Sequence, residues 1–179
     1  KNWYGCISEE GEERKIHLRL SKKDFYLNID WVDPNTGDCS GNNFVSYIYE
    51  GTIFQDPSSA YVYPNHAITD HDGNLINTYK VNLLINEIFQ IPKENWLADE
   101  WNNNKICGYK VNEWEANKKL SCPSRIPDPS SANQNLIYYD SLRDLVRFGT
   151  KNIIGGSSEI LNCGLFSQDN STPLNSICE

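Results

Sequence analysis

Strict alternation of apolar and polar residues is the feature that most limits how this chain can fold. Ile16, Leu18 and Leu20 are separated by polar residues, and Phe25–Trp31 repeats the same two-residue period. This period places alternate side chains on opposite faces of a β-strand, so each segment predicts a strand with one apolar face. The polar stretch Ser21–Asp24 between them predicts a turn, which makes the two strands an antiparallel hairpin.

Further strand-like segments follow along the chain. Phe44–Phe54 is rich in β-branched and aromatic residues and contains Gly51, which indicates a bend or a bulge. The turn signal Asp72-Gly73 precedes a long apolar run that ends at Phe89. The remaining strand-like segments are Ala60–Tyr63, Lys105–Glu115, Leu136–Tyr139 and Glu159–Phe166.

Two segments have helical features instead. Pro92–Trp101 begins with Pro, which suits a first helical position, and Ser141–Gly149 has apolar residues at helical spacing. Many short antiparallel strands joined by turns are typical of a barrel or a sandwich, and a barrel of this size can hold one small ligand. We predict a mainly β fold, a single antiparallel β-barrel of about eight strands with two short helices, spanning residues 1–179 as one domain.

The six cysteines predict a fold cross-linked by disulfides. An even number of Cys without a close C-x-x-C pair favours disulfides over a zinc site, with free buried thiols as the alternative. The spacing alone leaves the connectivity open. Nearest-neighbour pairing would join Cys6 to Cys39, Cys107 to Cys122 and Cys163 to Cys178. Because the chain begins with Lys1 and has no Met, we expect a mature chain whose signal peptide was removed, secreted or periplasmic.

The charge balance disfavours several partners. The net charge is −8 and the sequence pI is about 4.9, whereas binding to nucleic acid needs clustered Lys and Arg. The same acidity disfavours docking on anionic lipid. No apolar run approaches the roughly 20 residues that a membrane helix requires. We therefore expect neither a nucleic-acid partner nor a membrane span.

Motifs for catalysis and metal binding are weak. His66, Asp70, His71 and Asp72 could hold a metal, but the Asp-Gly signal favours a solvated turn. The acidic run Glu9–Glu13 predicts a solvated loop. No G-x-S-x-G motif and no phosphate-binding loop is present in the sequence. We expect no metal, no cofactor and no enzymatic activity, with a hydrolase using paired carboxylates as an alternative.

Aromatic residues give the main positive indication of function. The chain has five Trp, ten Tyr and six Phe, which suit the walls of a pocket or an interface. Ordinary core packing is the alternative. Trp96 and Trp101 could instead anchor a protein partner, although their spacing is poor for one helix face. The predicted ligand-lining residues are Phe25, Ile29, Trp31, Tyr47, Tyr49, Tyr79, Tyr109 and Trp114.

Short motifs in the chain also resemble a known family. In order they are Trp3–Cys6, Asp38-Cys39, Ile106–Gly108 with Trp114, Leu120–Cys122 and Leu145–Gly149. This order resembles lipocalin-like domains, including those of the APC-down-regulated (APCDD) family. The resemblance implies an extracytoplasmic β-barrel or half-barrel with a lipid-compatible cavity, and in animal members lipid capture linked to Wnt antagonism. It assigns no individual cavity residue.

Together these features predict an extracytoplasmic protein that binds a small hydrophobic or amphipathic ligand inside a β-barrel. A secreted protein-interaction module, acting as effector or inhibitor through exposed aromatics, is the first alternative. The sequon at Asn170 predicts a glycosylation site if the source is eukaryotic.

Overall fold

The computed structural model shows a mainly β protein with one α-helix and two 3₁₀-helices among the residues it describes. Its strands join in one antiparallel sheet, so the predicted fold class is confirmed at this level. The described residues are 1–9, 11–34, 36–62, 77–126, 134–140, 145–151, 158–160 and 165–166.

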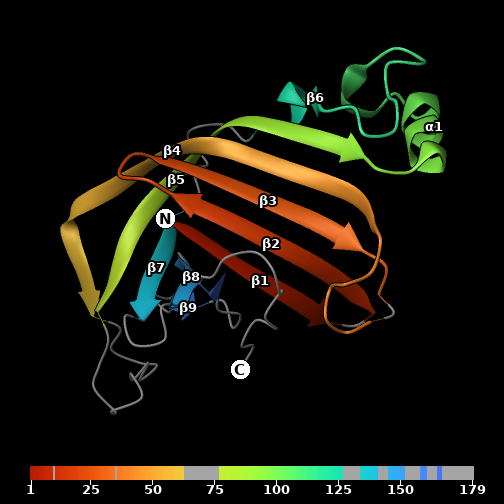
Figure 1. The fold of residues 1–179 in the computed structure, drawn as a ribbon. Helices are drawn as coiled ribbons and strands as arrows, with labels where there is room; N and C mark the ends of the chain where they lie inside the picture. The colour runs from red at the N-terminus through yellow and green to blue at the C-terminus, as the bar shows by residue number, and fades with distance from the viewer. Residues whose placement is uncertain are drawn as a thin grey trace.

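The first five strands lie side by side in chain order (Figure 1). They are β1 (Asn2–Glu9), β2 (Glu12–Leu20), β3 (Asp24–Val32), β4 (Asn43–Val62) and β5 (Asn77–Pro92). The predicted hairpin is β2 and β3, with Leu20 opposite Phe25 and Ile16 opposite Ile29. Its turn is held by Ser21, whose hydroxyl accepts a hydrogen bond from the Asp24 backbone N–H at 2.9 Å.

The sheet continues from β5 into strands of the second half of the chain. β7 (Gln134–Asp140) pairs with β5, β8 (Leu145–Lys151) pairs with β7, and β9 (Ser158–Ile160) pairs with β8. The short β10 (Leu165–Phe166) pairs with both β1 and β8.

Gly51 lies where β4 and β5 shift register, as the sequence predicts. The shift falls between Glu50 and Gly51 of β4. A Cβ atom at Gly51 would overlap the Leu84 carbonyl oxygen and approach the Phe25 ring to 2.7 Å. Only glycine therefore fits at this close contact between strands.

Strand alternation gives the sheet two chemically different faces. We call the face with Leu18, Phe25 and Trp31 the aromatic face, and the opposite face the His17 face. Val146 of β8 is buried against Trp3 and Leu18 of the aromatic face. Because β8 lies far from β2 in the strand order, this contact shows that the sheet curls around the aromatic face.

A helical segment covers one end of the aromatic face. It contains α1 (Asn95–Asn103), η1 (Ile106–Gly108), β6 (Leu120–Ser121) and η2 (Pro123–Arg125), and lies beyond the end of β5 in Figure 1. Leu97, Ala98 and Trp101 of α1 pack with Trp114 and with Val45 of β4. These contacts attach the helix to the sheet, because burial of its apolar stripe stabilises it.

Two element predictions are wrong. The predicted second helix over Ser141–Gly149 is not formed, because Leu145–Lys151 is strand β8 and pairs with β7 and β10. The predicted strand Lys105–Glu115 is replaced by η1 and irregular backbone, with left-handed φ angles at Lys105, Cys107 and Asn112. The helix predicted over Pro92–Trp101 is present as α1, but it begins at Asn95, because Pro92 is the last residue of strand β5.

The two predicted disulfides within the described residues are confirmed. Cys6 pairs with Cys39, and Cys107 pairs with Cys122. Cys163 and Cys178 lie outside the described residues, as does the predicted Asp72-Gly73 turn. Closure into a barrel of about eight strands and the single-domain assignment stay predictions.

No helix in the described part of the chain is long and apolar enough to cross a membrane.

Candidate ligand-binding face

Five of the predicted ligand-lining residues lie together on the aromatic face. Phe25, Ile29 and Trp31 alternate along β3, and Tyr47 and Tyr49 alternate along β4. Ile29 is directly opposite Tyr47 in the strand register, and Leu27 is opposite Tyr49. Side chains on paired positions of one face touch each other, so these residues form one continuous surface.

These side chains differ in how much solvent they contact. Phe25 is buried, with 5% of its surface exposed. Ile29, Trp31, Tyr47 and Tyr49 are only half-buried. Large apolar and aromatic groups that keep solvent contact on the curled-in face are available to a ligand.

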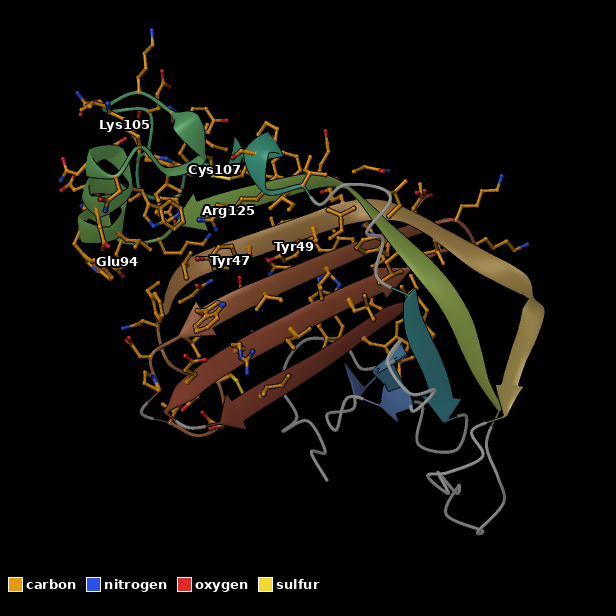
Figure 2. All side chains as sticks on the ribbon, turned by 180° about the vertical axis from the view of Figure 1, so that it is seen from behind. Tyr47, Tyr49, Glu94, Lys105, Cys107 and Arg125 are labelled. Carbon is orange, nitrogen blue, oxygen red and sulfur yellow. A yellow bond between two sulfur atoms is a disulfide. The ribbon has the colours of Figure 1, made fainter. Side chains whose placement is uncertain are left out.

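Arg125 of η2 brings a positive charge to the two tyrosines. Its guanidinium lies near the phenol of Tyr47. Burial raises the pKa of Tyr47 above its ordinary value, and the Arg125 charge opposes this shift. Burial likewise raises the pKa of Tyr49, with a further increase from Tyr47. Figure 2 shows Tyr47 and Tyr49 on β4 next to the helical segment that carries Arg125.

Gln90 of β5 lies directly opposite Tyr47 in the strand register. Its side chain is 1% exposed, and its amide nitrogen has no hydrogen-bond partner among the described residues. Its amide oxygen lies 3.7 Å from the sulfur of Cys107, but a disulfide sulfur has no hydrogen to donate. Gln90 therefore has a buried polar group whose hydrogen-bonding capacity is unused.

Trp31 lies at the end of the aromatic face that the helical segment covers. It packs against the buried cluster of Val45, Trp101 and Trp114, as Tyr47 also does. The guanidinium of Arg14 lies 5.6 Å from the centre of a Trp31 ring. This cation–π contact places a second basic side chain on the aromatic face.

Trp114 and Tyr109 lie in the helical segment rather than on strands. Trp114 is 2% exposed and meets Trp101 edge-to-face at 4.7 Å between ring centres. Tyr109 meets Trp114 in the same way at 5.4 Å and donates a hydrogen bond to the Ser121 carbonyl at 2.6 Å. Both rings therefore support the segment that borders the aromatic face. The side chain of Tyr79 lies outside what the structure describes.

The His17 face carries a polar aromatic stack. The ring of His17 stacks on Tyr4 at 4.6 Å and meets Tyr26 at 5.5 Å. Burial lowers the pKa of His17, Arg19 lowers it further, and Asp30 opposes the shift. A lowered pKa keeps this imidazole neutral at physiological pH.

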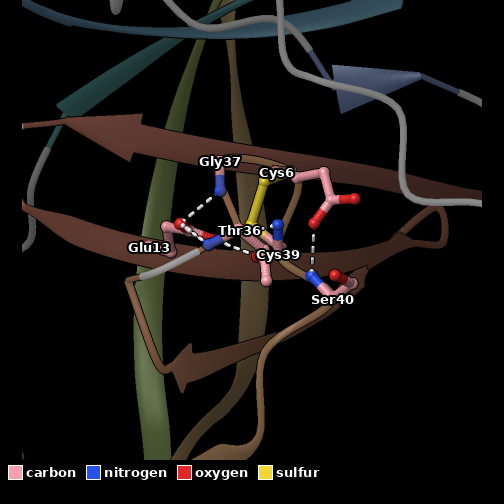
Figure 3. Close-up of a disulfide and its surroundings, with 7 residues drawn as sticks. Cys6, Glu13, Thr36, Gly37, Cys39 and Ser40 are labelled. Carbon is pink, nitrogen blue, oxygen red and sulfur yellow. Dashed lines mark hydrogen bonds between the residues drawn. A yellow bond between two sulfur atoms is a disulfide. The ribbon is translucent and has the colours of Figure 1, made fainter.

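A buried carboxylate organises the loop after β3. Glu13 is 2% exposed and accepts hydrogen bonds from the backbone N–H groups of Thr36, Gly37 and Cys39 (Figure 3). The Thr36 hydroxyl donates another at 3.0 Å. The prediction that Glu9–Glu13 is a solvated loop is therefore wrong for Glu13, because β1 and β2 begin their pairing inside this run.

An open pocket of about 360 Å³ lies where the loop after β3 meets the start of α1. It is lined by Asp33, Asn42, Phe44, Glu94 and Trp96. Trp96 is 58% exposed, whereas Trp101 is 7% exposed and belongs to the buried cluster. The predicted pair of partner-anchoring tryptophans is thus reduced to Trp96.

The chemistry of the described residues offers no metal centre. No group of three or more His, Cys, Asp or Glu side chains in this part of the chain could hold a metal ion. His66, His71 and their neighbouring aspartates lie outside the described residues, and so does Asn170.

Sequence reasoning missed Gln90 and Arg125. Gln90 lies on the long apolar run of β5, but only the strand register shows that it faces Tyr47. Arg125 belongs to a Pro- and Ser-rich stretch that predicts only a loop. No signal in the sequence connects it to β4.

Comparison with known proteins identifies no relative: neither a scan of protein-family models nor a search of curated proteins gives a match.

Proposed function

We propose that this chain is an extracytoplasmic protein that binds a small hydrophobic or amphipathic ligand against the aromatic face, within a lipocalin-like barrel. The observation that carries the proposal is the placement of Phe25, Ile29, Trp31, Tyr47 and Tyr49 on one face of two paired strands. Four of these side chains keep solvent contact.

Two features support closure of the sheet into a barrel. β10 pairs with β1 and with β8, which are far apart in the strand order. Val146 of β8 packs across the aromatic face against Trp3 and Leu18. A closed sheet of this kind can enclose a ligand.

The disulfides support the extracytoplasmic part of the proposal. Two disulfides fit an extracellular protein, because thiols are kept reduced in the cytosol.

Binding energy would come mainly from the hydrocarbon part of the ligand. Burial of apolar surface contributes roughly 25 cal/mol per Å², against which the cost of association must be set. The phenol groups of Tyr47 and Tyr49 would orient a polar end of the ligand. The face thus suits a single-chain amphiphile.

The experiment uses decanol as a neutral probe and the intrinsic tryptophan fluorescence, to which Trp31 on the aromatic face contributes, as the readout. Trp96→Phe serves as the background, because Trp96 is the most exposed of the described tryptophans. We expect saturable binding that weakens about tenfold in Tyr49→Ser. The matched control is Tyr26→Ser, which removes a half-buried tyrosine from the opposite face. Equal affinities in the two variants would place the ligand elsewhere, and absence of saturable binding would reject the proposal.

A further inference from the structure

Three hydrogen-bond donors meet at the edge of the aromatic face next to the helical segment. Arg125 comes from η2, Tyr47 from β4 and Gln90 from β5. The Arg125 guanidinium lies near the Tyr47 phenol (Figure 2), and Tyr47 lies opposite Gln90 in the register. Paired positions on one face bring Cβ atoms to about 5 Å, so Tyr47 is a neighbour of Gln90 as well as of Arg125.

The donors exceed the acceptors at this place. The Arg125 guanidinium has five N–H donors and no acceptor. The Tyr47 oxygen beside it can accept from only some of these donors. Gln90 is 1% exposed, and its amide nitrogen has no hydrogen-bond acceptor among the described residues. An oxygen-rich group at this place would supply acceptors for both the Gln90 amide and the guanidinium.

Acidic side chains are absent from the central part of this face. Over residues 14–20, 25–31, 45–53 and 83–92 the aromatic face carries Arg14 and no Asp or Glu. The carboxylates within these stretches, Asp30, Glu50 and Glu87, alternate onto the His17 face. In a chain with a net charge of −8, this arrangement keeps carboxylates off the part of the aromatic face around Tyr47 and Tyr49, whereas Glu9 and Glu12 lie at its β1–β2 end.

We infer that the aromatic face binds a long-chain carboxylate, whose head group lies between Arg125, Tyr47 and Gln90 and whose hydrocarbon tail lies along Tyr49 and Ile29. This inference rests on the proposed function and names the class of ligand. The guanidinium neutralises the carboxylate, and bidentate contacts orient it. The Tyr47 phenol and the Gln90 amide donate the remaining hydrogen bonds. The half-buried apolar groups of β3 and β4 then cover the tail.

The test compares decanoate with decanol, which share chain length and differ in the charge of the head group. Decanoate is titrated below its critical micelle concentration, and decanol below its solubility limit, into the Trp96→Phe protein at pH 7.5. We expect decanoate to bind at least about tenfold more tightly than decanol, the contribution expected of a charged hydrogen bond. Arg125→Gln should abolish this difference, because only the charged head group gains from the guanidinium; decanol binding in the same variant provides the reference affinity.

Two further variants test whether the preference for decanoate comes from the head-group site or from the overall positive charge of the helical segment. Lys105→Gln removes one positive charge from the same helical segment and should keep the preference for decanoate. Gln90→Leu keeps the volume, removes the enclosed donor and should reduce the preference several-fold. Circular dichroism and thermal melting check that each variant is folded.

The outcomes distinguish this inference from the proposed function. Equal affinity for decanoate and decanol, or a preference that survives Arg125→Gln, overturns the carboxylate site and leaves the proposed function standing. Binding of neither probe rejects the proposed function and the carboxylate site with it.

Discussion

The carboxylate of Glu13 on β2 accepts a hydrogen bond of 2.9 Å from the backbone N–H of Cys39, the residue that is disulfide-bonded to Cys6 on β1. One buried acidic side chain thus fixes the loop that carries the disulfide (Figure 3). The loop backbone is left-handed at Gly37 and Cys39, which directs their N–H groups toward the carboxylate. The stability of this end of the sheet should therefore depend on the ionised form of Glu13.

Glu13→Gln should lower the melting temperature at pH 7 by about 5 °C, because a neutral amide cannot accept the same set of hydrogen bonds. Desolvation raises the pKa of Glu13, but hydrogen bonds from Gly37, Thr36 and Cys39 outweigh it and lower the pKa overall. A lowered pKa stabilises the fold above the unfolded value of 4.5, and this contribution disappears as pH falls through the folded pKa. Melting curves from pH 7 to pH 3 should show the difference from wild type shrinking. A constant difference would contradict this role.

Gly51→Ala should destabilise the protein by about 3 kcal/mol, since the new methyl group would collide with β5 and the Phe25 ring. Gly11→Ala is the matched control, because its φ of +84° strains alanine but nothing lies within 4 Å. The control should cost only about 1 kcal/mol. Urea unfolding measures both, and a larger loss at Gly11 would show that the register shift at Gly51 tolerates a side chain.

Asn102→Ala should cost about 2–3 kcal/mol, because it leaves two buried backbone groups without partners. The Asn102 amide donates to the Trp114 carbonyl and accepts from the Trp114 N–H, both at 2.9 Å. Asn103→Ala, at the exposed next position, should change the free energy of unfolding by less than about 0.5 kcal/mol. Similar values for the two variants would mean that the two Asn102–Trp114 hydrogen bonds do not hold α1 in place.

Removal of the disulfides should destabilise the fold in the order of their loop lengths. Cys6 and Cys39 are 33 residues apart, and Cys107 and Cys122 are 15 apart. Loop-closure entropy predicts losses of about 4 and about 3 kcal/mol for the paired Cys→Ser variants. Denaturant titrations test this, and an unchanged midpoint in either variant would contradict the role of that bridge.

Alternation predicted the sheet well where one face is apolar and the other polar. It located the β2–β3 hairpin and placed Phe25 to Trp31 on a common face, because a one-residue slip would expose every apolar side chain. The glycine at position 51 also predicted the register shift, because a residue without a side chain inside a strand is typical of a bulge. These features depend on residues close together in the chain.

Features that depend on distant contacts were not predictable. Leu145 and Val146 fit helical spacing, but pairing with β7 and β10 makes them a strand. Tyr109 and Trp114 look strand-forming, yet the backbone of the Cys107–Cys122 loop is irregular, with left-handed φ angles at Asn112 and Asn117. The proximity of Arg125 to Tyr47 likewise arises only when η2 is attached to β5 through the Cys122–Ile88 backbone hydrogen bond.

The most direct test of the central claim is the titration of decanol into Tyr49→Ser and Tyr26→Ser, both made in the Trp96→Phe background. Tyr49 and Tyr26 lie on neighbouring strands but on opposite faces of the sheet. Binding against the aromatic face predicts about tenfold weaker affinity in Tyr49→Ser and wild-type affinity in Tyr26→Ser. Unchanged affinity in Tyr49→Ser, or a larger loss in Tyr26→Ser, would contradict the assignment of this face as the ligand site.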